Sequence, residues 1–262
     1  MLNNINLLSI APMMDRTDLH FRNLLRLISK NTLLYTEMIN TNAIIHDQNN
    51  RFNIESDCKG PIALQIGCSE PNSAAKAAKI FSKSNFQEIN INCGCPSNKV
   101  VNGNFGACLM KKPKKVGDMI EAIKENCDIP VTIKTRIGLD NYDTDQFLED
   151  FISELDNKNI AKVIIHARIA ILKGLSPHEN RTIPPINYER VKFIKESFNH
   201  IKVIVNGGIN TLNDAKYFLQ DFDGSMIGRA AWDNPWMFSN ADNIFFNKSI
   251  NISRYEIINN YL

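Results

Sequence analysis

The chain has 262 residues, of which 44% are hydrophobic, and its formal net charge is +2. This length and apolar content suffice for one large domain, such as an eight-stranded α/β barrel. A charge this close to zero neither demands nor excludes a nucleic-acid partner.

The sequence also indicates a location. No apolar run is long enough to span a bilayer, and the N-terminal stretch MLNNINLLSIAPMM lacks the features of a secretory signal. The six cysteines have no framework spacing, which favours reduced thiols and a cytoplasmic protein.

Eight short runs rich in Ile and Val are predicted to be strands buried on both faces. In chain order they are residues 7–13, 34–39, 62–67, 88–92, 131–136, 163–168, 203–207 and 225–229. Amphipathic helices lie between them. Two examples are the faces Phe21, Leu24, Leu25, Ile28 within residues 17–30, and Phe147, Leu148, Phe151, Ile152 within residues 145–157.

This alternation predicts a (β/α)8 TIM barrel over residues 1–240. The alternative is an open doubly wound sheet. That fold would need a Gly-x-Gly-x-x-Gly turn after the first strand, where this sequence reads APMMDRTD.

In TIM barrels the chemistry takes place at the C-terminal ends of the strands. One such histidine is usually structural, but Gln, Lys, His and Asn together at one rim predict a ligand site. The residues at these positions are Pro12, Met13, Met14, Glu37, Gln65, Asn90, Asn92, Lys134, Arg136, His166, Arg168, Asn206, Gly207, Gly208, Gly228 and Arg229.

The loops after strands seven and eight indicate the ligand. Gly207 and Gly208 precede a helix that begins near Thr211 or Asn213, and Gly228 and Arg229 follow the last strand. Backbone N–H groups in these loops form the usual phosphate site of the fold. The alternative is that both are merely tight turns.

A cofactor with a phosphate tail would lie across the barrel mouth. Lys134 fits a flavin, because a cation near N1 and the C2 carbonyl stabilises the reduced ring, and Gln65 can read its pyrimidine edge. Pyridoxal phosphate is the competing cofactor. It needs a partner for its ring nitrogen, and nothing in the sequence singles one out.

Two cysteines close the fourth predicted strand. Cys95 follows it in a turn set by Gly94 and Pro96, where a thiol would face a substrate over the flavin and act as an acid. Cys93 is interpreted as a small apolar residue at the strand end. A metal site is the alternative, but only Cys108 adds a nearby third sulfur and no histidine completes a tetrahedral set. We interpret the remaining cysteines as structural or incidental: Cys58, Cys68, Cys108 and Cys127.

Motifs along the chain resemble the tRNA-dihydrouridine synthases, most closely their A subfamily, from about residue 9 to residue 238. They are APMMDRTDLHFR, LLYTEMI, ALQIGCSEP, NINCGCPSNKVVNGNFGACLM, VTIKTRIG, IIHAR, GLSPHENRTIPPINYERV, NGGINTL and GRAAWDNPW. The resemblance implies an FMN enzyme that reduces the C5–C6 bond of uridines in the tRNA D-loop, with NADPH reducing the flavin. For the A subfamily it implies uridines 20 and 20a. tRNA is then the partner, with no membrane and no stable protein partner.

Carried over motif by motif, the resemblance makes Cys95 the proton donor, acting on a uridine extruded from the RNA. We predict no metal site, because of the cysteine pattern described above. tRNA or target-nucleotide contacts fall on Asn92, His178 and Arg181, and we expect His166 or Asn92 to stabilise the base. Flavin contacts fall on Pro12, Met13, Met14, Gln65, Lys134, His166, Asn206, Gly207, Gly208, Gly228 and Arg229.

The sequence departs from the family pattern in two places. Arg16 stands where the A subfamily commonly has Trp. The family continues into a helical domain after the barrel, so we expect residues 241–262 to begin a truncated C-terminal helical region. Its predicted apolar helix face, which we expect to have no partner left to cover it, consists of Ile252, Tyr255, Ile258 and Leu262.

We expect weak, salt-sensitive tRNA binding, because the chain offers few spare cations. They are Arg136, Arg168, Lys173, Arg181 and Arg190. The lysine-rich run 111–115 is interpreted as the solvated flank of a helix, since no aromatic residue is interleaved with it. Two other functions stay open: a flavin-dependent dehydrogenase of a free pyrimidine, and a non-catalytic RNA-binding relic.

Overall fold

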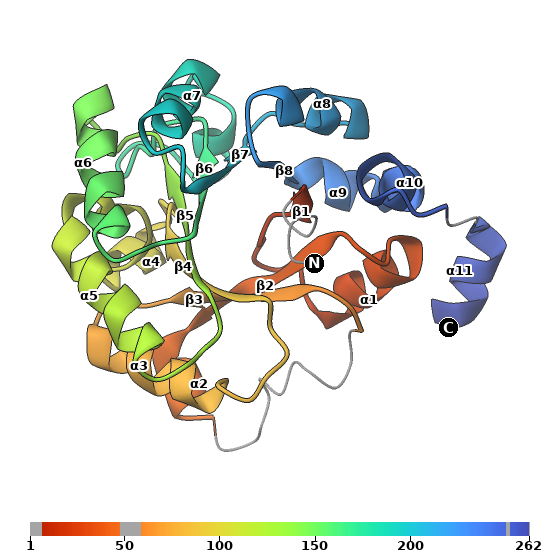
Figure 1. The fold of residues 1–262 in the computed structure, drawn as a ribbon, viewed down its shortest axis with the longest axis horizontal. Helices are drawn as coiled ribbons and strands as arrows, with labels where there is room; N and C mark the ends of the chain where they lie inside the picture. The colour runs from red at the N-terminus through yellow and green to blue at the C-terminus, as the bar shows by residue number, and fades with distance from the viewer. Residues whose placement is uncertain (1–6, 48–58, 250–251, 262) are drawn as a thin grey trace.

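The structure is a computed structural model that describes residues 7–47, 59–249 and 252–261. Eight parallel strands pair in chain order, and β8 pairs with β1 to close a barrel (Figure 1). The predicted TIM barrel is therefore confirmed. The strands are β1 (Leu8–Ile10), β2 (Leu33–Asn40), β3 (Ile62–Gly67), β4 (Glu88–Cys93), β5 (Val131–Arg136), β6 (Lys162–His166), β7 (Lys202–Asn206) and β8 (Gly224–Ile227).

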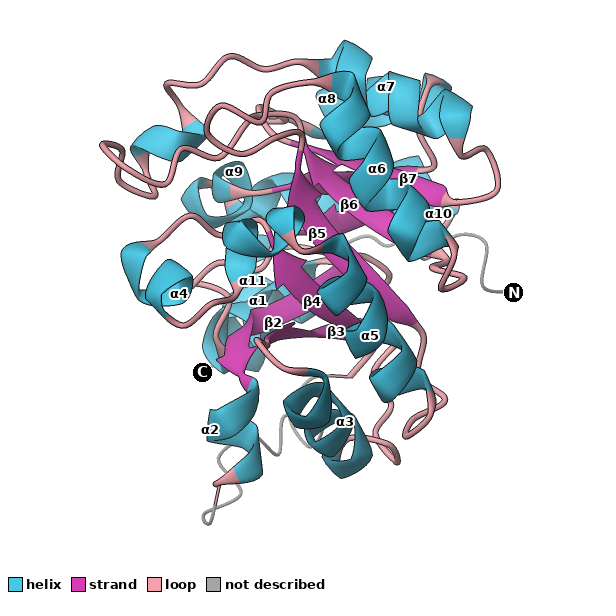
Figure 2. Cartoon of the chain, turned by 90° about the vertical axis from the view of Figure 1, so that its left-hand side faces the viewer, coloured by secondary structure: helices cyan, strands magenta, loops and turns pink. Residues whose placement is uncertain are grey.

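Helices surround the strands, as Figure 2 shows from the side. The longer ones are amphipathic; α1, for example, buries Phe21, Leu25 and Ile28 and begins at the N-cap Asp18, whose carboxylate accepts the N–H of Phe21. The α-helices are α1 (Leu19–Ile28), α2 (Thr41–Ile45), α3 (Pro71–Ile80), α4 (Asn98–Asn102), α5 (Pro113–Lys124), α6 (Asp145–Asp156), α7 (Tyr188–Ser197), α8 (Leu212–Tyr217), α9 (Arg229–Asp233), α10 (Ala241–Phe246) and α11 (Arg254–Tyr261).

Two apolar cores hold the barrel together because its strands are buried on both faces. The outer core lies between strands and helices and includes Ile89, Ile133 and Phe151. Each large aliphatic side chain buried in this way contributes about 1.5–3 kcal/mol. A smaller cluster consists of Ala11, Leu33, Tyr35, Ala63, Ile164, Ile204 and Met226.

Several strands end earlier than predicted. β1 stops at Ile10, because Pro12 has no N–H and the Met13 carbonyl turns back to accept the N–H of Thr17 at 2.9 Å. β6 stops at His166, whose carbonyl accepts the N–H of Arg168 at 2.7 Å. These turns leave the predicted rim residues on loops just beyond the strands.

The C-terminal helix α11 lies against α1 (Figure 1). Tyr255 and Ile258 of the predicted apolar face are 75% and 56% exposed, which agrees with the expectation that no partner covers them, while Ile257 is buried. Ile257 lies on a different side of the helix from the face that Tyr255 and Ile258 share, and α11 makes its contacts with α1. Ile252 packs against the core, and Leu262 lies outside the described residues. None of the helices that the structure describes is long and apolar enough to cross a membrane.

Candidate active site

The C-terminal strand ends bring five of the predicted site residues to one rim: Gln65, Asn92, Lys134, His166 and Asn206. The register accounts for this, because Asn92 pairs with Lys134 and His166 pairs with Asn206. Lys134 Nζ donates to Asn206 Oδ1 at 3.0 Å. Gln65 and Asn206 are almost fully buried. The polar rim is therefore a compact site inside the barrel mouth.

Positive charge dominates this site. Burial, reinforced by Arg136, lowers the pKa of Lys134 to about 7. Burial also lowers the pKa of His166 well below its ordinary value, and the next largest cause is again Arg136. Among the described residues, the buried His166 Nδ1 and Arg181 Nε have no hydrogen-bond partner. Desolvated donors and cations of this kind favour an anionic ligand.

The loop after β7 has a backbone that only glycine adopts easily. Gly207 and Gly208 have φ of +108° and +70°. A Cβ on Gly208 would lie 2.4 Å from Cδ1 of Ile186. Thr211 caps α8 as predicted, in a capping box with Asp214. The loop can thus present backbone N–H groups closely to a ligand.

Two residues assigned to different ligands are neighbours. Arg229 begins α9, and its Nη1 lies 3.3 Å from Nε2 of His178. Because a guanidinium only donates, His178 accepts through an unprotonated Nε2. Arg229, predicted to bind the flavin phosphate, is therefore in direct contact with His178, predicted to bind tRNA. Gly228 directly precedes Arg229 in the sequence.

The loop that carries His178 and Arg181 is anchored by Asn180, a residue the sequence analysis did not single out. The buried Asn180 side chain donates to the Ile171 carbonyl at 2.8 Å and accepts the Ile171 N–H at 2.7 Å. Its own carbonyl accepts from Arg136 Nη1 at 2.8 Å. The sequence feature that could have identified Asn180 is its position within the motif SPHENR, between His178 and Arg181.

The turn that carries Cys95 is fixed from two sides. Its N–H donates to Asn92 Oδ1 at 3.0 Å, and its carbonyl accepts the N–H of Ala107 at 2.9 Å. A Cβ on Gly106, which has φ of +76°, would lie 2.6 Å from the Cys95 carbonyl oxygen. Cys95 itself is partly exposed and packs in part against the apolar core.

The other cysteines that the structure describes are buried or only partly exposed. Cys93 is fully buried, and burial raises the pKa of its thiol, which agrees with its interpretation as a small apolar residue. Cys68 and Cys127 are buried, Cys108 is half-buried, and Cys58 lies outside the described residues. Within the described ranges, no three His, Cys, Asp or Glu side chains are grouped to hold a metal ion.

Pro12, Met13 and Met14 follow β1 at the same rim. Pro12 and Met13 are half-buried, whereas Met14 is 53% exposed. The next residue, Asp15, donates its N–H to Glu37 Oε1 at 2.5 Å and so ties this turn to β2. The flavin contacts predicted here stay a prediction.

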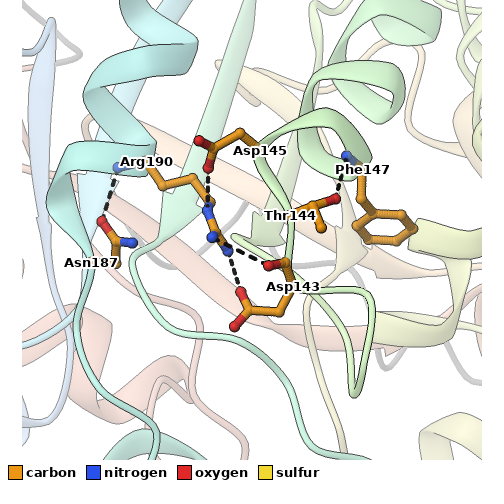
Figure 3. Close-up of polar contacts among 6 residues, drawn as sticks. All are labelled: Asp143, Thr144, Asp145, Phe147, Asn187 and Arg190. Atoms are coloured by element: carbon orange, nitrogen blue, oxygen red, sulfur yellow. Dashed lines mark hydrogen bonds and ion pairs between the residues drawn. The ribbon is translucent and has the colours of Figure 1, made fainter.

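Two of the cations expected to be available to tRNA are already engaged, so that expectation is wrong for them. Arg136 is 5% exposed and donates to the carbonyls of Gly94, Ile169 and Asn180. Arg190 forms ion pairs with Asp143 and Asp145 (Figure 3). The N–H donors of these two arginines already bond to carbonyls or carboxylates of the protein, so few of them are available to a phosphate.

The remaining basic groups differ in exposure. Lys173 is exposed, Arg181 is half-buried, and Arg168 Nη1 donates to the Pro184 carbonyl at 2.5 Å. The lysine-rich run flanks the start of α5 as predicted, and Lys115 there pairs with Glu70 at 2.6 Å.

Residues 9–259 match the sequence profile of the family described as Dihydrouridine synthase (Dus). The chain belongs to the dihydrouridine synthase family. It is 47% identical over 253 residues to a tRNA-dihydrouridine(20/20a) synthase of Vibrio parahaemolyticus, covering 96% of this chain and 77% of that protein. It is 49% identical over 242 residues to the protein of the same name from Escherichia coli O6:H1, covering 92% of this chain and 73% of that protein.

Two solved structures share the fold of this dihydrouridine synthase. Morphinone reductase in complex with tetrahydroNAD superposes with a TM-score of 0.62 at 13% identity, covering 95% of this chain and 89% of that one. A 2-naphthoyl-CoA reductase complex gives a TM-score of 0.68 at 8% identity, covering 89% of this chain and 49% of that one. At these identities the likeness concerns the barrel alone.

The residues at the rim of this dihydrouridine synthase fit FMN, the cofactor of the family. The buried Nδ1 of His166 has no partner and can accept from an N–H of a flavin ring, and the desolvated Lys134 can donate to a carbonyl or nitrogen of it. The backbone N–H groups of Gly207 and Gly208 and the guanidinium of Arg229 are groups that can donate to a phosphate.

Proposed function

We propose that this chain reduces uridine to 5,6-dihydrouridine in the D-loop of tRNA, at positions 20 and 20a, with FMN as cofactor and NADPH as reductant. The observation that carries the proposal is the partly exposed Cys95 at the same rim as Lys134, Arg136 and the neutral imidazole of His166. The names of the relatives, tRNA-dihydrouridine(20/20a) synthase, support the substrate and the positions.

When bound, FMN supplies a hydride to C6 of the uracil ring. Cys95 gives the proton from its thiol to C5, so that the hydride and the proton together saturate the C5–C6 bond. The thiolate that remains regains a proton from solvent.

Lys134 holds the negative charge of the cofactor ring, and Gln65 bonds to its pyrimidine edge. Arg229, with the N–H groups of Gly207 and Gly208, holds the phosphate. Binding an anion raises the pKa of Lys134 from its value of about 7, so the ammonium is charged when the site is filled.

The target base is held by Asn92 and His166. Asn92 uses one N–H for Gln65 Oε1, at 2.9 Å, and keeps a second N–H for a uracil oxygen. His166 is neutral near pH 7 because its pKa is lowered, so it has one ring N–H to donate. A donor at the uracil O4 stabilises the enolate character that develops during hydride addition.

We assign tRNA contacts outside the pocket to His178 and Arg181, and we take α10 and α11 as the start of a helical region that follows the barrel. A tRNA substrate places the activity in the cytoplasm.

The test uses tRNA that lacks dihydrouridine. The purified protein should show a flavin spectrum, and with NADPH it should convert uridines 20 and 20a, located by mass spectrometry of nuclease fragments. Free uridine and orotate, each with an unsaturated C5–C6 bond, serve as competing substrates. Turnover of a free pyrimidine at the rate of tRNA, or a protein that binds tRNA without flavin, would contradict the proposal.

A further inference from the structure

A buried ion pair lies at the opposite end of the barrel from Cys95. Glu88, the first residue of β4, pairs with Lys162, the first residue of β6, and both are about 5% exposed. The hydroxyl of Tyr35 donates to Glu88 Oε1, and Thr132 Oγ1 donates to the same oxygen at 2.9 Å. None of these four residues has a part in the proposed chemistry.

From this pair a chain of hydrogen bonds runs to the catalytic turn. Asn90 Nδ2 donates to Thr132 Oγ1 at 2.8 Å, and Gln65 Nε2 donates to Asn90 Oδ1 at 2.8 Å. Asn92 Nδ2 donates to Gln65 Oε1 at 2.9 Å, and the Cys95 N–H donates to Asn92 Oδ1 at 3.0 Å. The strand register makes this possible, since Gln65, Asn90 and Thr132 are neighbours across β3, β4 and β5.

The two ends of the chain impose one direction on it. An ionised Glu88 only accepts, so the Thr132 hydroxyl donates to it and leaves its oxygen to accept from Asn90. At the other end a backbone N–H only donates, so Asn92 must turn its oxygen toward Cys95. Reversing any amide between them would place donor against donor or acceptor against acceptor. Each amide therefore has one allowed orientation.

Stability alone gives no reason for this arrangement. The smaller core cluster beside the pair, which includes Ala63, Ile164 and Ile204, is apolar apart from the Tyr35 hydroxyl. Well-packed apolar residues are often as stabilising as a buried ion pair, without the cost of desolvating two charges. A carboxylate that sets the direction of a chain of amides cannot be replaced by an apolar group in the same way.

We propose that Glu88, paired with Lys162, is a positioning residue that acts through Thr132, Asn90, Gln65 and Asn92 to fix the turn of Cys95. The same chain orients the amides of Gln65 and Asn92 toward cofactor and base. This inference rests on the proposed function, in which Cys95 is the acid.

Thr132→Val tests the chain, because it removes one hydroxyl and neither charge. With flavin already reduced, single-turnover reduction of uridine in tRNA should slow about tenfold, the scale of one lost hydrogen bond. FMN content and the rate of flavin reduction by NADPH should equal those of the parent. Thr132→Ser should restore the uridine step.

Ser225→Ala is the matched control. Ser225 also carries a fully buried hydroxyl on a barrel strand. This hydroxyl donates to the Ala215 carbonyl at 2.7 Å and takes no part in the chain of hydrogen bonds from Glu88 to Cys95. It should leave both half-reactions unchanged. Equal slowing in this variant would overturn the proposal, since any buried hydroxyl would then have the same effect.

Amide hydrogen exchange at Gly94 and Cys95 reports the turn without relying on its chemistry. Thr132→Val should accelerate exchange at these two amides about tenfold. Unchanged exchange, or an unchanged uridine step, overturns the proposal. If Thr132→Val does not fold, the near-isosteric Asn90→Leu makes the same break. If Cys95→Ala reduces uridine at the parent rate, the assigned role of Cys95 is wrong, whereas the exchange result still tests the positioning.

Discussion

Lys134 on β5 and Asn206 on β7 are joined across the barrel mouth by a hydrogen bond of 3.0 Å, with β6 between their strands. Asn206 Nδ2 donates to the Met226 carbonyl at 2.8 Å, so its oxygen is directed to the lysine. The ammonium is thus held at a fixed point of the mouth, although its burial opposes the charge it carries.

We expect Lys134→Met to stabilise the apoprotein and to weaken FMN binding. The pKa of Lys134 is about 7 in the folded state against an ordinary 10.5, so the unfolded chain binds more protons between these values. The buried ammonium of Lys134 therefore lowers the free energy of unfolding of the apoprotein most at pH 7 and below. This loss shrinks as the pH rises toward 10.5. Thermal unfolding of apoprotein at several pH values should show the mutant's advantage shrinking with rising pH.

FMN titrations over the same pH range complete this test. In the parent, affinity should fall above pH 7, tenfold for each pH unit where one proton is taken up on binding. Lys134→Met should bind FMN more weakly at pH 7 and lose this pH dependence. Equal affinity and equal pH dependence in both proteins would remove Lys134 from the cofactor site.

Cys95→Ala should separate the two half-reactions. Because the thiol acts after the flavin is reduced, FMN content and reduction by NADPH should be those of the parent. Dihydrouridine formation in single turnover should fall about a hundredfold or more, the usual contribution of a general acid. Cys93→Ala is the control, since Cys93 is buried beneath the turn, and it should keep the rate.

The barrel and its rim were predictable because they follow from patterns in sequence. Ile- and Val-rich runs set the strands, and strand ends set the rim, which is how Gln65, Lys134 and His166 were found. The residue at which a strand such as β1 ends was not predictable. It depends on where a backbone carbonyl turns back to bond within a loop, as the Met13 carbonyl does to the N–H of Thr17.

Hydrogen bonds and ion pairs between residues far apart in the sequence could not be predicted either. Arg136 and Arg190 are cations like any other in the sequence, and their carbonyl and carboxylate partners appear only in the folded chain. A signal for the buried pair did exist: Glu88 and Lys162 are charged residues at the start of strands that are buried throughout. Since buried charges need partners, each implied the other.

Gly208→Ala should lower FMN affinity through the shape of the loop. The residue has φ of +70°, and its new Cβ would lie 2.4 Å from Ile186 Cδ1, so the loop must shift. The left-handed backbone alone costs about 1–2 kcal/mol. Gly174→Ala is the control, because Gly174 has φ of +90° with no atom within 4 Å of the added Cβ. Both variants should lose stability, and only Gly208→Ala should release FMN more readily. Similar FMN affinities in the two variants would show that the loop after β7 does not hold the phosphate.

The salt dependence of tRNA binding should distinguish the two arginines that sequence alone could not. Arg181 is half-buried at the rim with an unpartnered Nε, whereas Arg190 is held by Asp143 and Asp145. Each phosphate contact that is lost should reduce the slope of log affinity against log salt by about 0.7–0.9. Arg181→Gln should therefore reduce the slope by the amount expected for the loss of about one phosphate contact. Arg190→Gln changes the net charge equally but should leave the slope as in the parent. Binding isotherms at four or five salt concentrations are sufficient for this comparison. Equal slopes for the two variants would mean that tRNA responds to the overall charge of the barrel and that Arg181 contacts no phosphate.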